Sequence, residues 1–144
     1  MAAIAANLKG LGEYYDLRAR CYESLGTMDL ATADYKKAEE LGVGKERARS
    51  VVADCTKLID ENSKDLDAAM LRMAYRTRAE SYMRVGEYRN AIDDFSQCIA
   101  RSPQRGYFYR MRSECYDKLG MDDLATSDRQ RLEGLGFARD LKLT

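Results

Sequence analysis

Histidine and tryptophan are absent from this chain of 144 residues, and proline occurs once. Without histidine the chain lacks the side chain that most often exchanges protons near neutral pH. It also lacks the glycine-rich phosphate loops and the G-x-S-x-G nucleophile motif that many enzymes carry. The sequence therefore predicts a protein that is not an enzyme and holds no cofactor.

An excess of charge of either sign is also missing, because 24 basic residues balance 24 acidic ones. A neutral chain lacks the usual electrostatic attraction to nucleic acids and to anionic membranes. No run approaches the roughly 20 apolar residues that span a bilayer. The first residues include neither a basic leader nor a long apolar run, which argues against a signal peptide. We expect no nucleic-acid and no membrane partner.

The four cysteines are scattered and form no C-x-x-C motif, so the ligand spacing of a zinc site is missing. We expect no metal, and we interpret Cys21, Cys55, Cys98 and Cys115 as buried free thiols. Free thiols are typical of a reducing compartment, which indicates a cytoplasmic protein. A disulfide pair is the alternative.

A short motif recurs three times along the chain. Tyr15–Tyr22 reads Y-D-L-R-A-R-C-Y, and similar runs occupy Tyr75–Tyr82 and Tyr109–Tyr116. A glycine and then an alanine follow each run at the same spacing. The second and third copies lie 34 residues apart, a period typical of structural units that stack on their neighbours.

Helical spacing of apolar residues dominates the chain, and no segment alternates as a strand would. Glycines and the Ser102-Pro103 step mark the helix ends. The pattern predicts seven helices, over residues 5–25, 28–41, 45–61, 66–85, 88–101, 105–119 and 122–134. A short helical tail follows in this interpretation.

The stretch from Ala74 to Pro103 resembles a tetratricopeptide repeat. The signature positions of that family are filled by Tyr75, Ala79, Tyr82, Gly86, Tyr88, Ala91, Phe95, Cys98 and Pro103. The same register gives repeats at about 12–45, 72–105 and 106–139, the last with Arg129 where the family has an aromatic residue. The resemblance implies an all-α fold, a right-handed α-solenoid of antiparallel helical hairpins in a single domain, 1–144.

Arginine and aspartate also recur at fixed positions of the three repeats. Arginine stands at one position of every first helix, and aspartate at one position of every second helix. The pairs are Arg18 with Asp34, Arg78 with Asp94, and Arg112 with Asp128. A constant separation predicts a bidentate bridge across each hairpin. The alternative is six unrelated surface charges.

Residues 46–71 are too short for a full repeat. Val51–Ser63 resembles a second helix, displaced by 40 residues from Ala91–Pro103, and no first helix precedes it. This degenerate half-repeat predicts a break in the regular array.

In tetratricopeptide proteins the first helices line a concave groove, and the resemblance implies which residues face it. The candidate partner-binding residues are Met73, Arg76, Glu80, Met83, Arg84, Tyr107, Arg110, Met111 and Glu114. The first repeat offers Glu13, Asp16, Leu17, Arg20, Glu23 and Ser24 at the same positions. As alternatives, Arg76–Glu80 and Arg110–Glu114 are simple surface pairs, and Met73 and Met111 belong to the core.

These observations predict an adaptor that binds a peptide or protein, with acidic groups or a free carboxylate, in the groove. One alternative is a self-associating assembly module, with Leu135, Phe137, Leu141 and Leu143 pairing with another chain instead of capping the array. An RNA-binding helical-repeat protein is a weaker alternative, since the net charge is zero.

Overall fold

The computed structural model describes the backbone of residues 2–143, and their side chains except those of Ala5, Met28 and residues 137–143. Over this range the chain forms seven α-helices and no strand, which confirms the predicted all-α class. The elements are α1 (Ala2–Ser24), α2 (Met28–Glu40), α3 (Lys45–Asn62), the 3-10 turn η1 (Ser63–Asp65), α4 (Ala68–Arg84), α5 (Tyr88–Arg101), α6 (Gly106–Lys118) and α7 (Asp122–Leu143).

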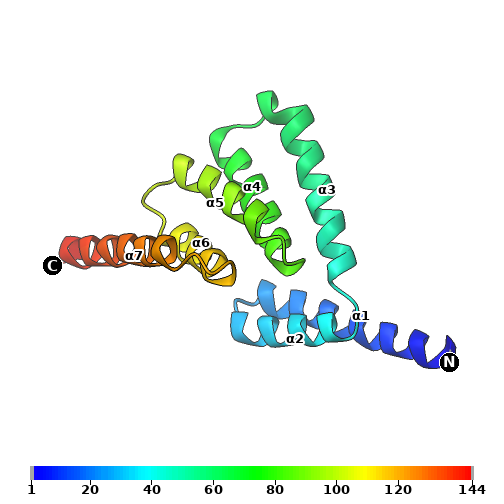
Figure 1. The fold of residues 1–144 in the computed structure, drawn as a ribbon. Coiled ribbons are helices and arrows are strands. Elements are labelled where there is room, and N and C mark those ends of the chain that lie inside the picture. Colours follow the sequence, from blue (N-terminus) through cyan, green and yellow to red (C-terminus); the bar gives the residue numbers. More distant parts are fainter. Residues whose placement is uncertain (1, 144) are drawn as a thin grey trace. The chain divides into compact units, whose positions relative to one another are not determined.

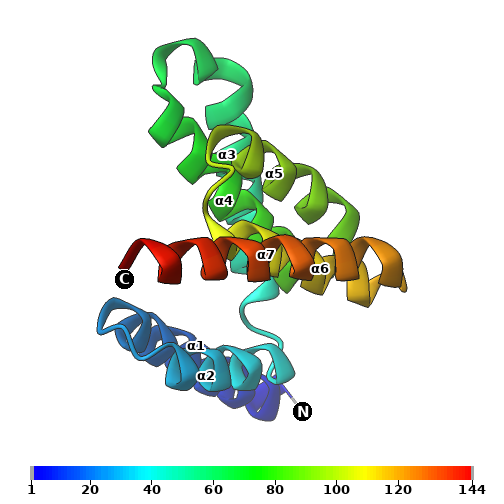
Figure 2. The same cartoon turned by 90° about the vertical axis from the view of Figure 1, so that its left-hand side faces the viewer.

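Six of these helices pair as three antiparallel hairpins. Figure 1 and Figure 2 show α2 alongside α1, and α7 alongside α6, while α4 pairs with α5. The turn inside each hairpin contains a glycine with a left-handed backbone, Gly26, Gly86 or Gly120, at φ 78°, 81° and 72°. Only glycine adopts such φ values without steric cost, which explains the glycine of every repeat.

The chain divides into two compact units, Met1–Arg49 and Ser50–Thr144. The first contains the hairpin α1/α2, with the N-terminal part of α1 extending past α2 (Figure 1). The second contains α4 to α7 and most of α3. In the second unit α5 also packs on α6, so the two hairpins stack.

The C-terminal helix is longer than the sequence pattern predicts. Gly134 and Gly136 were expected to end it at residue 134, but α7 continues to Leu143. Neither glycine has a positive φ. Glycine lowers helix stability by about 1 kcal/mol relative to alanine without forcing an end. Of the residues proposed for self-association, Leu135 is half-buried, and Phe137, Leu141 and Leu143 lie outside the described side chains.

Small residues allow the helices of each hairpin to approach closely. Ala79 and Ala91 are fully buried, as are their counterparts Ala19, Ala31 and Ala125. In the second unit Phe95 and Phe108 fill the space around them, together with Cys98 and Cys115. Each buried phenylalanine contributes roughly 1.5–3 kcal/mol through the apolar area it removes from water.

The cysteines are free thiols, but the expectation that all four are buried is wrong for Cys21. Cys55, Cys98 and Cys115 are buried, and Cys21 is exposed on α1. Burial raises the pKa of Cys98 and of Cys115 to about 12, so these thiols stay protonated. Cys21 differs because no described helix covers its face of α1.

All three predicted arginine–aspartate bridges form, and each is bidentate. Nε and Nη2 of Arg18 donate to the two Asp34 oxygens at 2.6 and 2.8 Å. The Arg78 bonds to Asp94 both measure 2.7 Å. The bonds from Arg112 to Asp128 measure 2.8 and 2.7 Å. Every aspartate of these bridges is buried, so each hairpin contains one charge-assisted fork between its two helices.

In the second unit the arginine makes a third bond, to the helix before its own hairpin. Nη1 of Arg78 donates to Thr56 Oγ1 of α3 at 3.2 Å. Nη1 of Arg112 donates to Ser96 Oγ of α5 at 3.0 Å. Thr56 and Ser96 are 40 residues apart in the sequence, the displacement already seen between the half-repeat and α5. The hydroxyl of α3 thus accepts a bond from α4 as that of α5 does from α6, although the backbone of α3 does not approach α4 as closely as α5 approaches α6.

Replacing Asp94 with alanine should lower the free energy of unfolding by about 1–3 kcal/mol, because Arg78 would lose two charge-assisted bonds inside the protein. A matched control is Asp117→Ala, which removes an exposed bridge to Arg129 of equal length, 2.7 Å. We expect that control to cost less than about 1 kcal/mol. Urea unfolding of the two variants measures both values, and equal losses would contradict a structural role for the buried bridge.

Candidate functional site

Two first helices of stacked hairpins, α4 and α6, bring charged and aromatic side chains together. The Tyr107 hydroxyl of α6 donates to Glu80 Oε1 of α4 at 2.7 Å. The same oxygen accepts a bond from Arg76 Nε at 2.8 Å. Arg110 lies one helical turn after Tyr107. We name these four residues, Arg76, Glu80, Tyr107 and Arg110, the Tyr107 cluster.

Two guanidinium groups lie over the ring of Tyr107. The Arg76 guanidinium lies 4.5 Å from the ring centroid, and the Arg110 guanidinium lies 5.6 Å from it. Each such contact contributes about 0.5–1 kcal/mol at an exposed site. Arg76 is also bound to a carboxylate, whereas within the described residues Arg110 forms no ion pair. Arg110 is thus a positioned, exposed cation.

The electrostatics of the cluster keep its ring in place. Burial, followed by the charge of Glu80, raises the pKa of Tyr107 above its usual value. The phenol therefore remains protonated at neutral pH and acts as the donor to Glu80. Because that bond joins α6 to α4, the cluster is fixed relative to both hairpins.

The structure brings together four of the nine predicted partner-binding residues. Met83 and Met111 pack against the hydrophobic core, which confirms the core alternative for Met111. Met73 is exposed, so that alternative is wrong for Met73. Glu114 is exposed and Arg84 is half-buried. Of the two candidate surface pairs only Arg76–Glu80 forms an ion pair in the described part of the chain.

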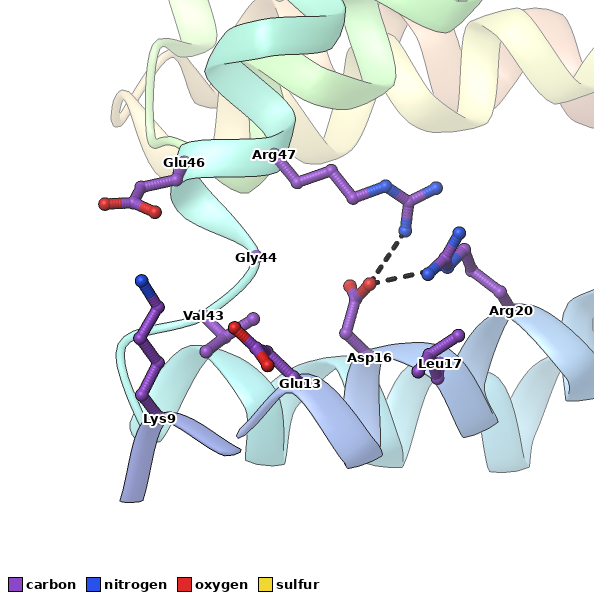
Figure 3. Close-up of a pocket in the computed structure, with 9 residues that line it drawn as sticks. All are labelled: Lys9, Glu13, Asp16, Leu17, Arg20, Val43, Gly44, Glu46 and Arg47. Carbon is purple, nitrogen blue, oxygen red and sulfur yellow. Dashed lines mark hydrogen bonds and ion pairs between the residues drawn. The ribbon is translucent and has the colours of Figure 1, made fainter. Parts of the chain in front are cut away.

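A cavity lies within the first unit (Figure 3). Its volume is about 330 Å³, and four of its lining residues hold groove positions implied by the family resemblance, Glu13, Asp16, Leu17 and Arg20. The remaining lining residues come from Lys9 and from the segment that leads into α3, Val43, Gly44, Glu46 and Arg47.

Buried Asp16 organises this cavity. Its Oδ2 accepts a hydrogen bond from Arg47 Nη1 at 2.9 Å and lies 3.4 Å from Arg20 Nε (Figure 3). Arg47 was not among the expected groove residues, because the half-repeat to which it belongs has no counterpart in the family register. Three acidic and three basic side chains line the cavity, so their charges cancel and favour neither an anion nor a cation.

The described residues contain no group of three or more metal-binding side chains. Nor does any described helix have the length and apolar character needed to cross a bilayer.

Two of the three hairpins match the model of a known protein family. The model of the tetratricopeptide repeat matches residues 12–41 and 74–105. The chain carries tetratricopeptide repeats. The matched segments are the hairpins α1/α2 and α4/α5, in the register proposed from the sequence. No curated protein matches the chain. Tetratricopeptide repeats generally mediate protein–protein interactions, and the Tyr107 cluster lies on first helices of such hairpins.

Tyr107→Phe should lower the free energy of unfolding by about 0.5–1.5 kcal/mol, because the ring stays while its bond to Glu80 is lost. Tyr107→Leu should cost more, because it also removes the aromatic face beneath Arg76 and Arg110. Urea unfolding with both variants separates the hydroxyl from the ring. Wild-type stability of both variants would show that the cluster does not join the two hairpins.

Proposed function

We propose that this protein is an interaction scaffold whose Tyr107 cluster binds the carboxylate groups of an acidic partner peptide or protein. The observation that supports the proposal is the state of Arg110. Its guanidinium is exposed, lies over the Tyr107 ring and forms no ion pair within the described residues. Arginine in this state can bind a carboxylate through two parallel hydrogen bonds.

Preorganisation supports the same function. A binding arginine normally loses rotamer freedom when it contacts a ligand, at a cost of about 0.5–1.5 kcal/mol per side chain. Contact with the Tyr107 ring restricts Arg110 before any ligand arrives. Tyr107 is itself held by Glu80, so part of the ordering cost is met during folding.

The two arginines have different roles in this proposal. Glu80 neutralises Arg76 at 2.8 Å, and an incoming carboxylate would compete with Glu80 for that guanidinium. Arg110 has no such competitor among the described residues. We therefore expect Arg110 to make the primary contact and Arg76 to add a smaller, more salt-sensitive contribution.

A fluorescein-labelled peptide of four glutamates with a free C-terminus is a suitable first probe, read by fluorescence polarisation. The Arg110→Glu variant should weaken its binding about tenfold, equivalent to about 1.4 kcal/mol. Adding Arg76→Glu should weaken it further, since both changes introduce repulsion toward a carboxylate.

The matched control is Arg89→Glu, an identical charge change at an exposed position of α5. We expect that control to bind the probe within about twofold of wild type, since long-range surface charge is screened by salt. If Arg89→Glu weakened binding of the probe as much as Arg110→Glu, the effect would be explained by net charge alone and not by a contact at Arg110. A folded double variant with wild-type affinity would remove Arg76 and Arg110 from the site. If the double variant does lose affinity for the probe, a pull-down with mass spectrometry that compares it with wild type would identify the natural partner.

A further inference from the structure

One face of α1 carries large apolar side chains in line with the bridging arginine. The face consists of Leu11, Tyr14, Arg18 and Cys21, and Leu25 follows directly after the helix ends at Ser24. We name these five residues the α1 stripe. The helical residues among them recur at steps of three and four, so they lie on one side of the helix. Tyr14 is 53% exposed and Leu25 is 75% exposed.

The equivalent stripes of α4 and α6 are covered. Ala74 and Ser81 flank Arg78 at the same spacing, and both are buried. Phe108 and Cys115 flank Arg112, and they are fully buried beside residues of α5. The arginines follow the same trend, since the side chain of Arg18 is 40% exposed while those of Arg78 and Arg112 are 15% and 19% exposed.

The bonds of the arginine indicate what is missing from α1. In α4 and α6 the Nη1 group donates to a hydroxyl on a second-type helix that precedes the hairpin, Thr56 or Ser96. In α1 the same group turns instead to Tyr14 of its own helix, at a long 3.4 Å. The α1 stripe therefore has the exposed apolar residues and the donor of a stacking face, and no described helix covers it.

The two covering helices share a pattern. In α5, Ile92 and Ile99 flank Ser96 and pack against the core that contains Phe108. In α3, Val52 and Ile59 flank Thr56 at the same spacing, four residues before and three after the hydroxyl. A helix that covers such a stripe thus presents an apolar residue, a Ser or Thr four residues on, and another apolar residue three beyond.

The remaining second-type helices of the chain do not fit. At the three equivalent positions α2 carries Thr32, Lys36 and Glu39, and α7 carries Thr126, Gln130 and Glu133. A lysine at the central position would face Arg18 with a like charge, and a glutamate replaces the second isoleucine. The helices that do fit, α3 and α5, already serve α4 and α6. A second copy of this chain is therefore a poor occupant.

We propose that the α1 stripe is a docking face for one amphipathic helix of a separate partner protein, with the pattern apolar–x3–Ser/Thr–x2–apolar. Stacking would cover Tyr14, Cys21 and Leu25, and the partner hydroxyl would accept the Arg18 Nη1 bond now made to Tyr14. The surface is distinct from the Tyr107 cluster, and the proposal does not depend on the proposed function of that cluster.

Cys21 provides a readout at the stripe itself, because it is exposed while the other three thiols are buried. The probe is a synthetic peptide of residues 45–62, the α3 sequence, with Cys55→Ala to remove its own thiol. Alkylation of Cys21 in the full chain, followed by mass spectrometry, should slow about fivefold at a peptide concentration of about four times Kd, because only the free fraction reacts.

Two controls define the recognition. A peptide that also carries Thr56→Lys, which copies the lysine of α2, should give no protection at the same concentration. Leu25→Lys in the full chain should weaken protection by the original peptide, and circular dichroism checks that this exposed substitution leaves the fold intact. Peptide that merely displaced the chain's own α3 from α4 would leave Cys21 alkylation unchanged.

Failure of the original peptide to protect Cys21 would overturn the proposal. Protection that rises with the concentration of the chain alone, together with a dimer in sedimentation velocity, would also overturn it, because the occupant would then be a second copy. Equal protection by the Thr56→Lys peptide would show that the stripe binds helices without the predicted pattern, which contradicts the proposal as well.

Discussion

The structure depends on one arginine per hairpin. Its guanidinium forms two bonds to a buried aspartate on the partner helix, and in the second unit a third bond to a hydroxyl on the preceding helix. A buried aspartate without that fork would be strongly destabilising, and a buried arginine without its acid equally so. Only guanidinium has the planar, multiple donors needed to bind both neighbours at once. The same side chain thus holds a hairpin together and, in the second unit, joins it to the helix before it.

This constraint also indicates which second helices are suited to cover a first helix. The bridging arginine of the following hairpin needs a hydroxyl acceptor between two apolar residues. Among the second helices, only α3 and α5 provide that combination. The central positions of α2 and α7 carry Lys36 and Gln130, in polar surroundings. The degenerate half-repeat therefore has a structural role. Thr56 of α3 accepts the bond from Arg78 of α4, whereas α2 carries Lys36 at the equivalent position.

The periodicity was sufficient to predict the seven helices and the three bridges, because both follow from positions repeated along the chain. It did not predict the third bond, although the displacement of 40 residues aligns Thr56 with Ser96 in the sequence itself. At the candidate site the pattern placed Tyr107 and Glu80 on first helices, but their contact depends on the distance between two stacked hairpins. Burial was misjudged at Cys21 for the same reason: sequence position alone does not show which neighbour covers a helix.

A double-mutant cycle between Ser96→Ala and Arg112→Lys tests the central claim most directly, because lysine keeps the charge but loses the fork. Urea titrations give the free energy of unfolding of the four proteins, with hydrogen exchange in α6 and α7 as the readout. The four values give the coupling energy between the hydroxyl and the guanidinium. We expect a coupling of about 1 kcal/mol, the usual net contribution of one hydrogen bond. Additivity within about 0.3 kcal/mol would mean that the third bond does not join the hairpins.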